Sequence, residues 1–127
     1  MPLVRIDLLA GKSAQYRETI GAAVYDAMVS TINVPKNDRF QIVTEHPEGE
    51  LFIDPNYLGI SRTKDCIIID ITLTEGRSLD LKKAFFKAIA DNLHERLQLR
   101  REDVMIVLTE VKKENWSFGN GIASYAT

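Results

Sequence analysis

The second residue of the chain, Pro2, could become a reactive group. A small residue behind the initiator Met1 normally allows an aminopeptidase to remove the methionine, which would leave Pro2 with a free secondary amine. Inside a chain, proline has neither an N–H nor a basic nitrogen. An N-terminal proline, in contrast, is a compact base on a rigid ring. The alternative interpretation is structural, because proline also suits the end of an edge strand.

The other residue types that often carry chemistry show no such pattern. His46 and His94 have no Cys or His partner at a metal-ligand spacing, and the sequence contains no glycine-rich phosphate loop. We therefore expect both histidines to be solvated. Cys66 lies in the apolar run CIIIDI and is predicted to be a buried thiol that acts as a small hydrophobe. The sequence thus predicts no metal and no cofactor.

Length and composition restrict the class of protein. With 127 residues, 45% of them hydrophobic, the chain fits a single domain spanning 1–127. The net charge of −2 and scattered Lys and Arg argue against a nucleic-acid partner. No apolar run approaches the ~20 residues that span a bilayer, and Arg5 and Asp7 interrupt the N-terminus too early for a signal peptide. We expect a cytoplasmic protein without membrane contact.

An internal repeat organises the chain. The stretch DRFQIVTE, residues 38–45, recurs as DVMIVLTE at residues 103–110, an offset of 65 residues. LLAGKS, residues 8–13, recurs as LTEGRS at residues 73–78 with the same offset. Two matches in one register indicate a duplication, with repeats at about 1–62 and 63–127.

Each repeat is predicted to form a strand, a helix and a second strand. Alternating apolar residues indicate a first strand around residues 4–8, and the nearly continuous apolar run 66–73 indicates a strand covered on both faces. A glycine turn and a serine N-cap should follow each of these strands, at Gly11 with Ser13 and at Gly76 with Ser78.

Apolar residues at intervals of three or four then predict two helices, the first of them ended by Pro35. The predicted buried stripes are Ile20, Val24, Ala27 and Met28, and Phe85, Ile89, Leu93 and Leu97.

Two β-α-β units predict an α+β fold. Joined, they give a four-stranded sheet with both helices on one face, because a parallel pair of strands takes a right-handed helical crossover. The opposite face would remain apolar and uncovered, which predicts a homo-oligomer. Residues 46–65 have the composition of a linker, but the run LFI predicts a short extra strand or hairpin within them.

The repeat gives Pro2 no counterpart in the second half. The offset of 65 residues assigns its position to Ile67, a predicted core residue. Each subunit would therefore carry one site with a free proline amine, and a trimer would carry three.

Four stretches of this chain resemble the tautomerase superfamily. These stretches are MPLVRIDL, VPKNDRFQIV, EGRS and WSFGNGIASY, which occur in that order along nearly the whole chain. The similarity is greatest to the long, duplicated members resembling malonate semialdehyde decarboxylase and 4-oxalocrotonate tautomerase. The resemblance implies a duplicated β-α-β fold, assembly into a trimer, and an N-terminal proline as the central catalytic group.

The resemblance also implies roles for individual residues. Pro2 matches the catalytic proline, Asp38 the acidic residue near it, and Arg77 an arginine that binds the substrate carboxylate. An aromatic wall is implied at Trp116, Phe118 and Tyr125. Each residue has a structural alternative: a turn for Asp38, solvent for Arg77, and a subunit interface for the aromatic residues.

The protonation state of Pro2 would decide its chemistry. An α-amino group has a pKa of about 7.7–8.0, which an apolar wall and the Arg77 cation would lower and Asp38 would raise. A neutral amine is a general base that moves a proton between oxygen and carbon, or it can form an imine. A cationic amine acts as an acid or polarises a carbonyl.

Some positions depart from the family pattern. Glu75 stands where the decarboxylases have the first of two arginines, and Phe40 and Met105 stand where 4-oxalocrotonate tautomerase has a strand arginine. One firm cation is left, which favours a small monocarboxylate with a keto, enol or aldehyde group. The second cation could come from a neighbouring subunit, through Lys12, Arg39 or Arg62.

Three functional hypotheses follow. The first is keto–enol tautomerisation of a small 2-oxo acid or its enol, with Pro2 as general acid or base. The second is decarboxylation or hydration of a small 3-oxo acid such as malonate semialdehyde, with Asp38 assisting Pro2 and Arg77 holding the carboxylate. The third is a non-catalytic oligomeric binding protein that has kept the fold.

Overall fold

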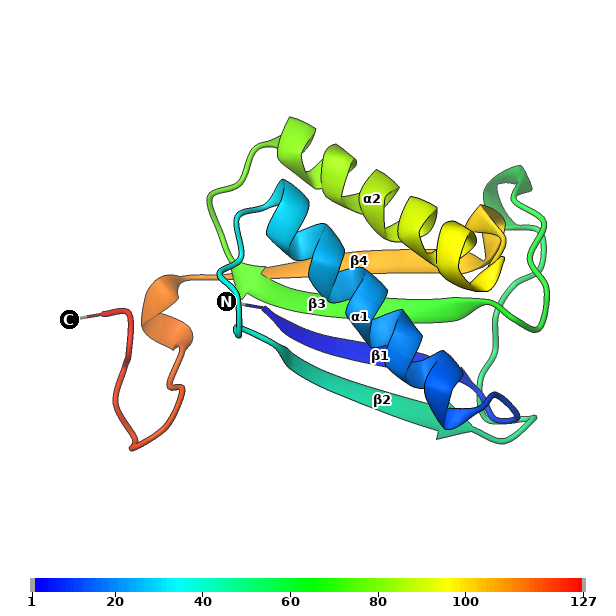
Figure 1. Cartoon of the computed structure of the whole chain (residues 1–127), viewed down its shortest axis with the longest axis horizontal. Helices are drawn as coiled ribbons and strands as arrows, with labels where there is room; N and C mark the ends of the chain where they lie inside the picture. Colours follow the sequence, from blue (N-terminus) through cyan, green and yellow to red (C-terminus); the bar gives the residue numbers. More distant parts are fainter. Residues whose placement is uncertain (1, 127) are drawn as a thin grey trace.

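The structure, a computed structural model, describes residues 2–126. Four strands form one sheet, and two long helices cover one of its faces (Figure 1). In chain order the main elements are β1 (Leu3–Leu9), α1 (Ala14–Thr31), β2 (Phe40–His46), β3 (Ile67–Thr74), α2 (Leu79–Leu97) and β4 (Val104–Val111). Single turns of 3₁₀-helix, η1 (Tyr57–Gly59), η2 (Arg101–Asp103) and η3 (Lys113–Asn115), lie in the connections. The predicted α+β fold of two β-α-β units is confirmed.

The sheet has the strand order β2-β1-β3-β4, with β1 and β3 at its centre. Each repeat contributes a parallel pair, and the two repeats meet where β1 runs antiparallel to β3. In that pair Arg5 lies opposite Asp70, and the offset of 65 residues assigns these two to the same position. A pseudo-twofold axis therefore passes between them. It relates the end of the sheet at which β1 starts to the end at which β3 starts.

The turns that start both helices agree with the sequence. Gly11 and Gly76 have φ values of 121° and 120°, a region that favours glycine. The Ser13 hydroxyl accepts a hydrogen bond from the Tyr16 N–H at 3.0 Å, and the Ser78 hydroxyl accepts one from the Leu81 N–H at 3.2 Å. The first helix, however, ends at Thr31 and not at Pro35.

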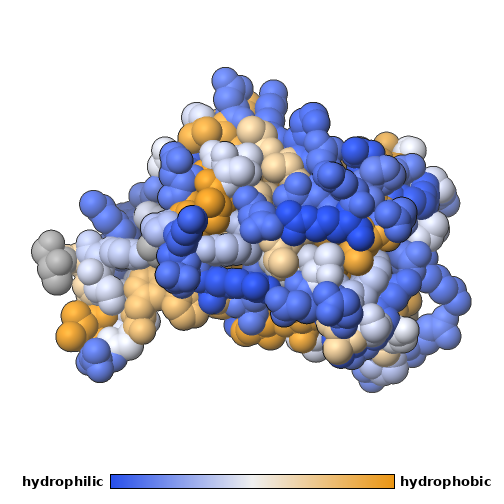
Figure 2. All heavy atoms as spheres, in the orientation of Figure 1, coloured by the Kyte–Doolittle hydropathy of each residue, from blue (hydrophilic) through white to orange (hydrophobic). Residues whose placement is uncertain are grey.

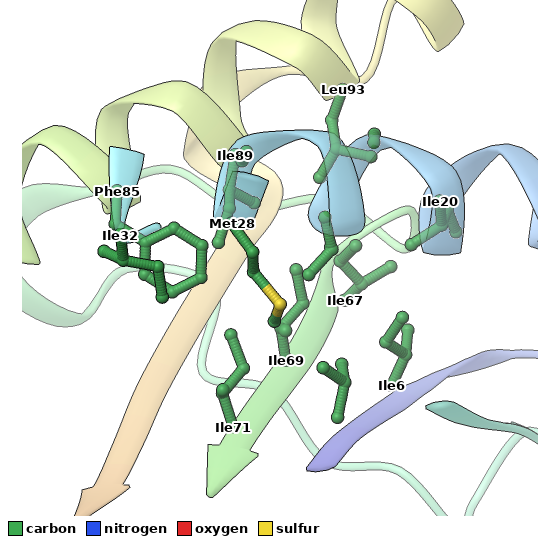
Figure 3. Close-up of a cluster of buried hydrophobic side chains, with 14 of the residues drawn as sticks. Ile6, Ile20, Met28, Ile32, Ile67, Ile69, Ile71, Phe85, Ile89 and Leu93 are labelled. Atoms are coloured by element: carbon green, nitrogen blue, oxygen red, sulfur yellow. The ribbon is translucent and has the colours of Figure 1, made fainter. Parts of the chain in front are cut away.

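The core lies between the sheet and the two helices (Figure 3). Met28 extends from α1 towards Ile69 in the centre of the sheet, and Phe85 and Ile89 enter the same layer from α2. Of the predicted stripes, only Leu97 is incompletely buried. Burial of these side chains from water is the main stabilisation of the fold.

The face of the sheet opposite the helices is open and partly apolar. It carries exposed apolar side chains on both edge strands: Phe40, Ile42, Met105 and Val107. On β3 the side chains that face the helices are buried, whereas Ile68 and Asp70 on the other face are half-buried. The helices cover one face of this strand as predicted, and the cover predicted for the other face, a second copy of the chain, stays a prediction. The helix side is largely hydrophilic, and apolar atoms come into view along the lower edge and on the C-terminal arm (Figure 2).

The linker between the repeats contains a helical turn and not the predicted strand or hairpin. Among residues 47–66 the regular structure is η1. The Arg62 guanidinium holds this loop through its Nη1, which donates to the carbonyl oxygens of Asp54, Tyr57 and Ile60 at 3.1 to 3.3 Å. An arginine that satisfies loop carbonyls makes a β ladder unnecessary.

Candidate functional site

Pro2 lies buried at the start of β1, in a pocket of about 200 Å³. β1 is a central strand, so the interpretation of Pro2 as the end of an edge strand is wrong. β4 is parallel to β3, and both end at the end of the sheet where β1 starts (Figure 1). The chain beyond β4 therefore reaches Pro2. The pocket is lined by Pro2, Leu3, Phe40, Trp116, Ser117 and Phe118.

The C-terminal arm, residues 112–126, supplies the aromatic wall of this pocket. Trp116 stacks on Phe118 with ring centroids 5.2 Å apart, and the Tyr125 ring meets Phe118 edge-on at 5.1 Å. Phe40 contacts Phe118 from β2, with centroids 6.0 Å apart. Aromatic pairs of these geometries are favourable beyond their burial alone. Three aromatic residues predicted from the sequence therefore form one cluster with Phe40.

Arg77 follows β3 at the end of the sheet where β1 starts, and it uses much of its guanidinium within the fold. Nε and Nη2 donate to the Ile32 carbonyl at 3.3 and 3.2 Å, and Nη1 donates to the Thr74 carbonyl at 3.1 Å. A guanidinium has five N–H donors, so these bonds leave two of them. Burial lowers the pKa of Arg77, and the Glu110 carboxylate partly offsets this effect. The residue is neither a free clamp nor simply solvated.

Asp38 lies two residues before Phe40, and both of its carboxylate oxygens are buried. Its main-chain N–H donates to the Pro35 carbonyl at 3.3 Å, which closes the turn that leads into β2. Burial, and to a smaller extent the charge of Asp38, raise the pKa of the Tyr125 phenol. Asp38 thus closes a turn and also acts by its charge on the aromatic wall, so the two roles expected for it do not exclude each other.

The candidate second cations all have partners within this chain. Lys12 pairs with Asp65 at 2.8 Å, Arg39 pairs with Glu18 at 3.2 Å, and Arg62 holds the linker loop. None of the three lines the Pro2 pocket.

The two histidines behave differently from each other. His94 is exposed on α2, as expected, and its Nδ1 lies 3.3 Å from the Leu99 carbonyl. His46 is half-buried at the end of β2, with Nε2 2.6 Å from the Asp7 carboxylate, and is therefore not simply solvated. Across residues 2–126 no group of three or more His, Cys, Asp or Glu side chains is arranged to hold a metal. No helix of the described chain is long and apolar enough to cross a bilayer.

Two residues of the site were not identified from the sequence. Phe40 was interpreted only as a missing arginine, yet it forms part of the pocket. Thr74 accepts a hydrogen bond from Trp116 Nε1 at 3.0 Å, and its carbonyl accepts from Arg77. A signal for Thr74 was present, because the first repeat has Leu9 at the corresponding position.

The arrangement suits a small ligand with an apolar body and one negative charge. The pocket beside Pro2 is aromatic, and Arg77, at the same end of the sheet, has two N–H groups beyond the three that its main-chain hydrogen bonds use. A free proline amine placed there could exchange a proton with a bound carbon acid.

Comparison with known proteins identifies the family. Residues 38–119 match one family model described as a tautomerase enzyme, and residues 2–60 match a second with the same description. This chain belongs to the tautomerase family. A probable tautomerase of Bacillus subtilis, YusQ, is 40% identical over 123 residues, which cover 97% of each chain. A second probable tautomerase of that organism, YrdN, is 32% identical over 127 residues, covering 100% of this chain and 98% of YrdN.

Among solved structures, two malonate semialdehyde decarboxylases are similar to this chain over nearly its whole length. A malonate semialdehyde decarboxylase superposes with a TM-score of 0.91 at 30% identity, covering 97% of this chain and 95% of that one. The FG41 malonate semialdehyde decarboxylase, inhibited by 3-bromopropiolate, gives 0.91 at 36% identity, with coverages of 97% and 93%. A fused 4-OT that forms a symmetric trimer gives 0.79 at 22% identity, covering 98% of each chain, and supports the fold alone. The expected tautomerase resemblance is confirmed.

Proposed function

We propose that this protein is an enzyme that uses Pro2, freed by removal of Met1, for proton transfer on a small 2-oxo acid or its enol. The single observation that carries the proposal is the burial of Pro2 in an aromatic pocket built by β1, β2 and the C-terminal arm. A proline that only started a strand would not require Trp116 and Phe118 around it. The family supports the same role for this residue.

In the proposed reaction, neutral Pro2 takes a proton from the enol hydroxyl or the carbon of the substrate and returns it at the other position. The substrate carboxylate takes the two Arg77 N–H groups that the fold leaves open. Phe118 and Trp116 pack against the apolar body and exclude water from the amine. Asp38 adjusts the basicity of the amine by its charge.

The test combines intact mass with a substrate panel. We expect the purified protein to begin at Pro2 and to tautomerise phenylenolpyruvate. Pro2→Ala should lower turnover at least tenfold, since acid–base groups contribute about 10²–10⁴. Pro47→Ala, an exposed proline directly after β2 at the other end of the sheet, serves as the control and should retain most of the turnover. Active protein that keeps Met1 completely, or full activity of Pro2→Ala, would refute the proposal.

A decarboxylase is the second candidate, favoured by the similarity to two malonate semialdehyde decarboxylases at 30% and 36% identity. In that reaction cationic Pro2 polarises the carbonyl of a 3-oxo acid, and Asp38 must be ionised to keep the amine charged. Glu75, exposed at the position of a second arginine in the family pattern, weakens this candidate.

Asp38→Asn separates the two reactions. A tautomerase with a neutral base should keep much of its activity, or gain some at lower pH, when the nearby anion is removed. A decarboxylase should lose most of its turnover. The measurement is a pH–rate profile of Asp38→Asn and the parent protein on phenylenolpyruvate and malonate semialdehyde. A parent protein inactive on both substrates would favour a non-catalytic binding protein.

We also propose that the chain assembles as a homotrimer through the open face of the sheet. Phe40 and Met105, each 49% exposed, lie on opposite edges of this face, and covering them would remove apolar surface from water. The trimer of the fused 4-OT shows that this fold can assemble in threes. Light scattering should give the mass of three chains, and a stable monomer at micromolar concentration would refute the trimer.

A further inference from the structure

Thr74, the last residue of β3, joins two parts of the site through its two oxygen atoms. Its hydroxyl accepts the hydrogen bond from Trp116 Nε1 at 3.0 Å, and its carbonyl accepts the one from Arg77 Nη1 at 3.1 Å. The aromatic wall and the guanidinium are therefore anchored to the same residue. Thr74 itself does not line the Pro2 pocket.

The hydrogen bond determines what Trp116 can offer to a ligand. The indole N–H is the single donor of a tryptophan side chain, and Thr74 occupies it. Trp116 therefore lines the pocket without offering a donor, and its ring stacks on that of Phe118, which also lines the pocket, at an interplanar angle of 14°. Without the acceptor on β3, the indole could rotate and turn its N–H into the pocket.

The repeat shows that the fold does not need this hydrogen bond. The offset of 65 residues assigns Thr74 to Leu9 and Trp116 to Leu51. Both leucines line a pocket of about 420 Å³ at the opposite end of the sheet. Neither side chain can donate or accept a hydrogen bond. The donor and the acceptor thus occur together at the end that has Pro2, and both are replaced at the end that lacks it.

We propose that Thr74 is a positioning residue that acts through Trp116. Its hydroxyl fixes the plane of the indole beside Pro2, which keeps the pocket shaped for an apolar substrate body. This inference rests on the proposed function of Pro2, because the effect on catalysis needs a Pro2-dependent reaction. The hydrogen bond and its effect on the indole can be tested without any turnover.

The experiment uses Trp116 as a probe, since it is the one tryptophan in the sequence. The variants are Thr74→Val, which removes the hydroxyl at nearly constant volume, and Thr74→Ser, which keeps it. Thr19→Val on α1, whose hydroxyl donates to the Gln15 carbonyl at 2.8 Å, is the matched control. We expect Thr74→Val alone to lower the fluorescence anisotropy of Trp116 and to increase its quenching by acrylamide.

In the kinetic part, Thr74→Val should raise KM for phenylenolpyruvate about three- to tenfold, the equivalent of one net hydrogen bond, with a smaller change in kcat. Thr74→Ser should restore the KM. In a Trp116→Phe background, which lacks the donor, Thr74→Val should add little further effect, because the two residues act through one bond. If Thr74→Val folds poorly, Trp116→Phe replaces it as the test, because it removes the donor of the same hydrogen bond and should raise KM by a similar factor.

The outcomes distinguish this inference from the proposed function. Unchanged anisotropy and quenching in Thr74→Val would overturn the positioning role whatever the kinetics. A fluorescence change without a KM change, or additive effects in the Trp116→Phe background, would overturn its link to catalysis. A parent protein without Pro2-dependent turnover would overturn the proposed function and the kinetic claim with it, whereas the fluorescence would still decide the hydrogen bond.

Discussion

At one end of the sheet β1 begins behind a buried Pro2, and at the other end β3 begins at Ile67, the position that the repeat assigns to Pro2. The first end has an aromatic pocket of about 200 Å³ closed by the C-terminal arm. The second has a pocket of about 420 Å³ between the linker and the end of β1, where apolar residues such as Leu51 and Phe52 alternate with charged residues such as Glu48, Arg62 and Lys64. The two ends of one sheet thus carry different pockets. They differ in the segment that precedes the central strand, which is Pro2 before β1 and the linker before β3.

The two aspartates at corresponding positions make this difference concrete. Asp103 is fully buried and accepts hydrogen bonds from the main-chain N–H and the hydroxyl of Thr63, both at 2.7 Å. It therefore fixes the linker that leads into β3. Asp38 occupies the same position of the first repeat, where its charge contributes to the raised pKa of Tyr125 in the C-terminal arm. The same carboxylate can hold a chain at one end and adjoin a pocket at the other.

The largest effect expected from this comparison is on stability, through Asp103→Ala. Loss of the carboxylate removes two charge-assisted hydrogen bonds from Thr63, at a cost of about 3–5 kcal/mol, whereas Arg100 keeps Glu102 as a partner. Asp38→Ala should cost less than half as much and should change the pH dependence of turnover instead, because it removes the charge near the amine. Urea unfolding and activity measurements on both variants check this. Equal losses of stability would show that the two aspartates have the same structural role.

The fold was predictable from the sequence because the signals for it are local. The repeat, the alternation of Val4 with its neighbours, and the caps at Ser13 and Ser78 each depend on a few adjacent residues. The linker was predicted wrongly because the apolar run at residues 51–53 resembles a strand, whereas a distant side chain, Arg62, sets the path of the loop.

The candidate site was only partly predictable. The resemblance identified the aromatic wall and Arg77, but the carbonyl groups that occupy Arg77 come from Ile32 and Thr74, on the helix and strand before it. Contacts between segments 45 residues apart in the chain leave no pattern in a single sequence. The exchange of Thr74 for Leu9 between the repeats was a visible signal, but its meaning requires the position of Trp116.

A second prediction compares the cations of the two ends, Arg77 and Lys12. Arg77→Ala should raise KM about tenfold to a hundredfold, because a charge-assisted contact to the substrate carboxylate is lost. Lys12→Ala should leave KM unchanged and alter the free energy of unfolding by less than about 1 kcal/mol, since its Asp65 partner is 52% exposed.

Steady-state kinetics on both variants measure the difference, and Arg77→Lys shows how much of the effect is charge alone. A rise in KM for Lys12→Ala as large as that for Arg77→Ala would show that Arg77 is not the specific binding group for the substrate carboxylate.

A third prediction concerns the residue directly before Ile67. Cys66 is 1% exposed, and burial raises the pKa of its thiol, so it should react slowly with a disulfide reagent at pH 8. We expect the native protein to react at least about tenfold more slowly than the protein in urea, because reaction requires opening of the structure. Modification at the unfolded rate would mean that this end of the sheet is open, in contrast to the buried start of β3.

The smallest expected effect is a shift in the titration of Tyr125, whose counterpart in the first repeat, Ile60, cannot titrate. Burial and the charge of Asp38 both raise the pKa of this phenol, because each disfavours the phenolate. Asp38→Asn removes the charge and leaves the burial, so the pKa should fall but stay above its ordinary value. The contribution of Tyr125 to stability is present below the pKa of the unfolded chain and is lost as the pH rises through the higher pKa of the folded state. Asp38→Asn should therefore move this alkaline loss of stability to lower pH.

The difference in absorbance at alkaline pH between each protein and its Tyr125→Phe form isolates the titration of Tyr125, with Asp54→Asn in the linker as the control. If the titration of Tyr125 is the same in Asp38→Asn and in the parent, Asp38 does not act on the aromatic wall, and the contrast between the two aspartates reduces to the linker that only Asp103 holds.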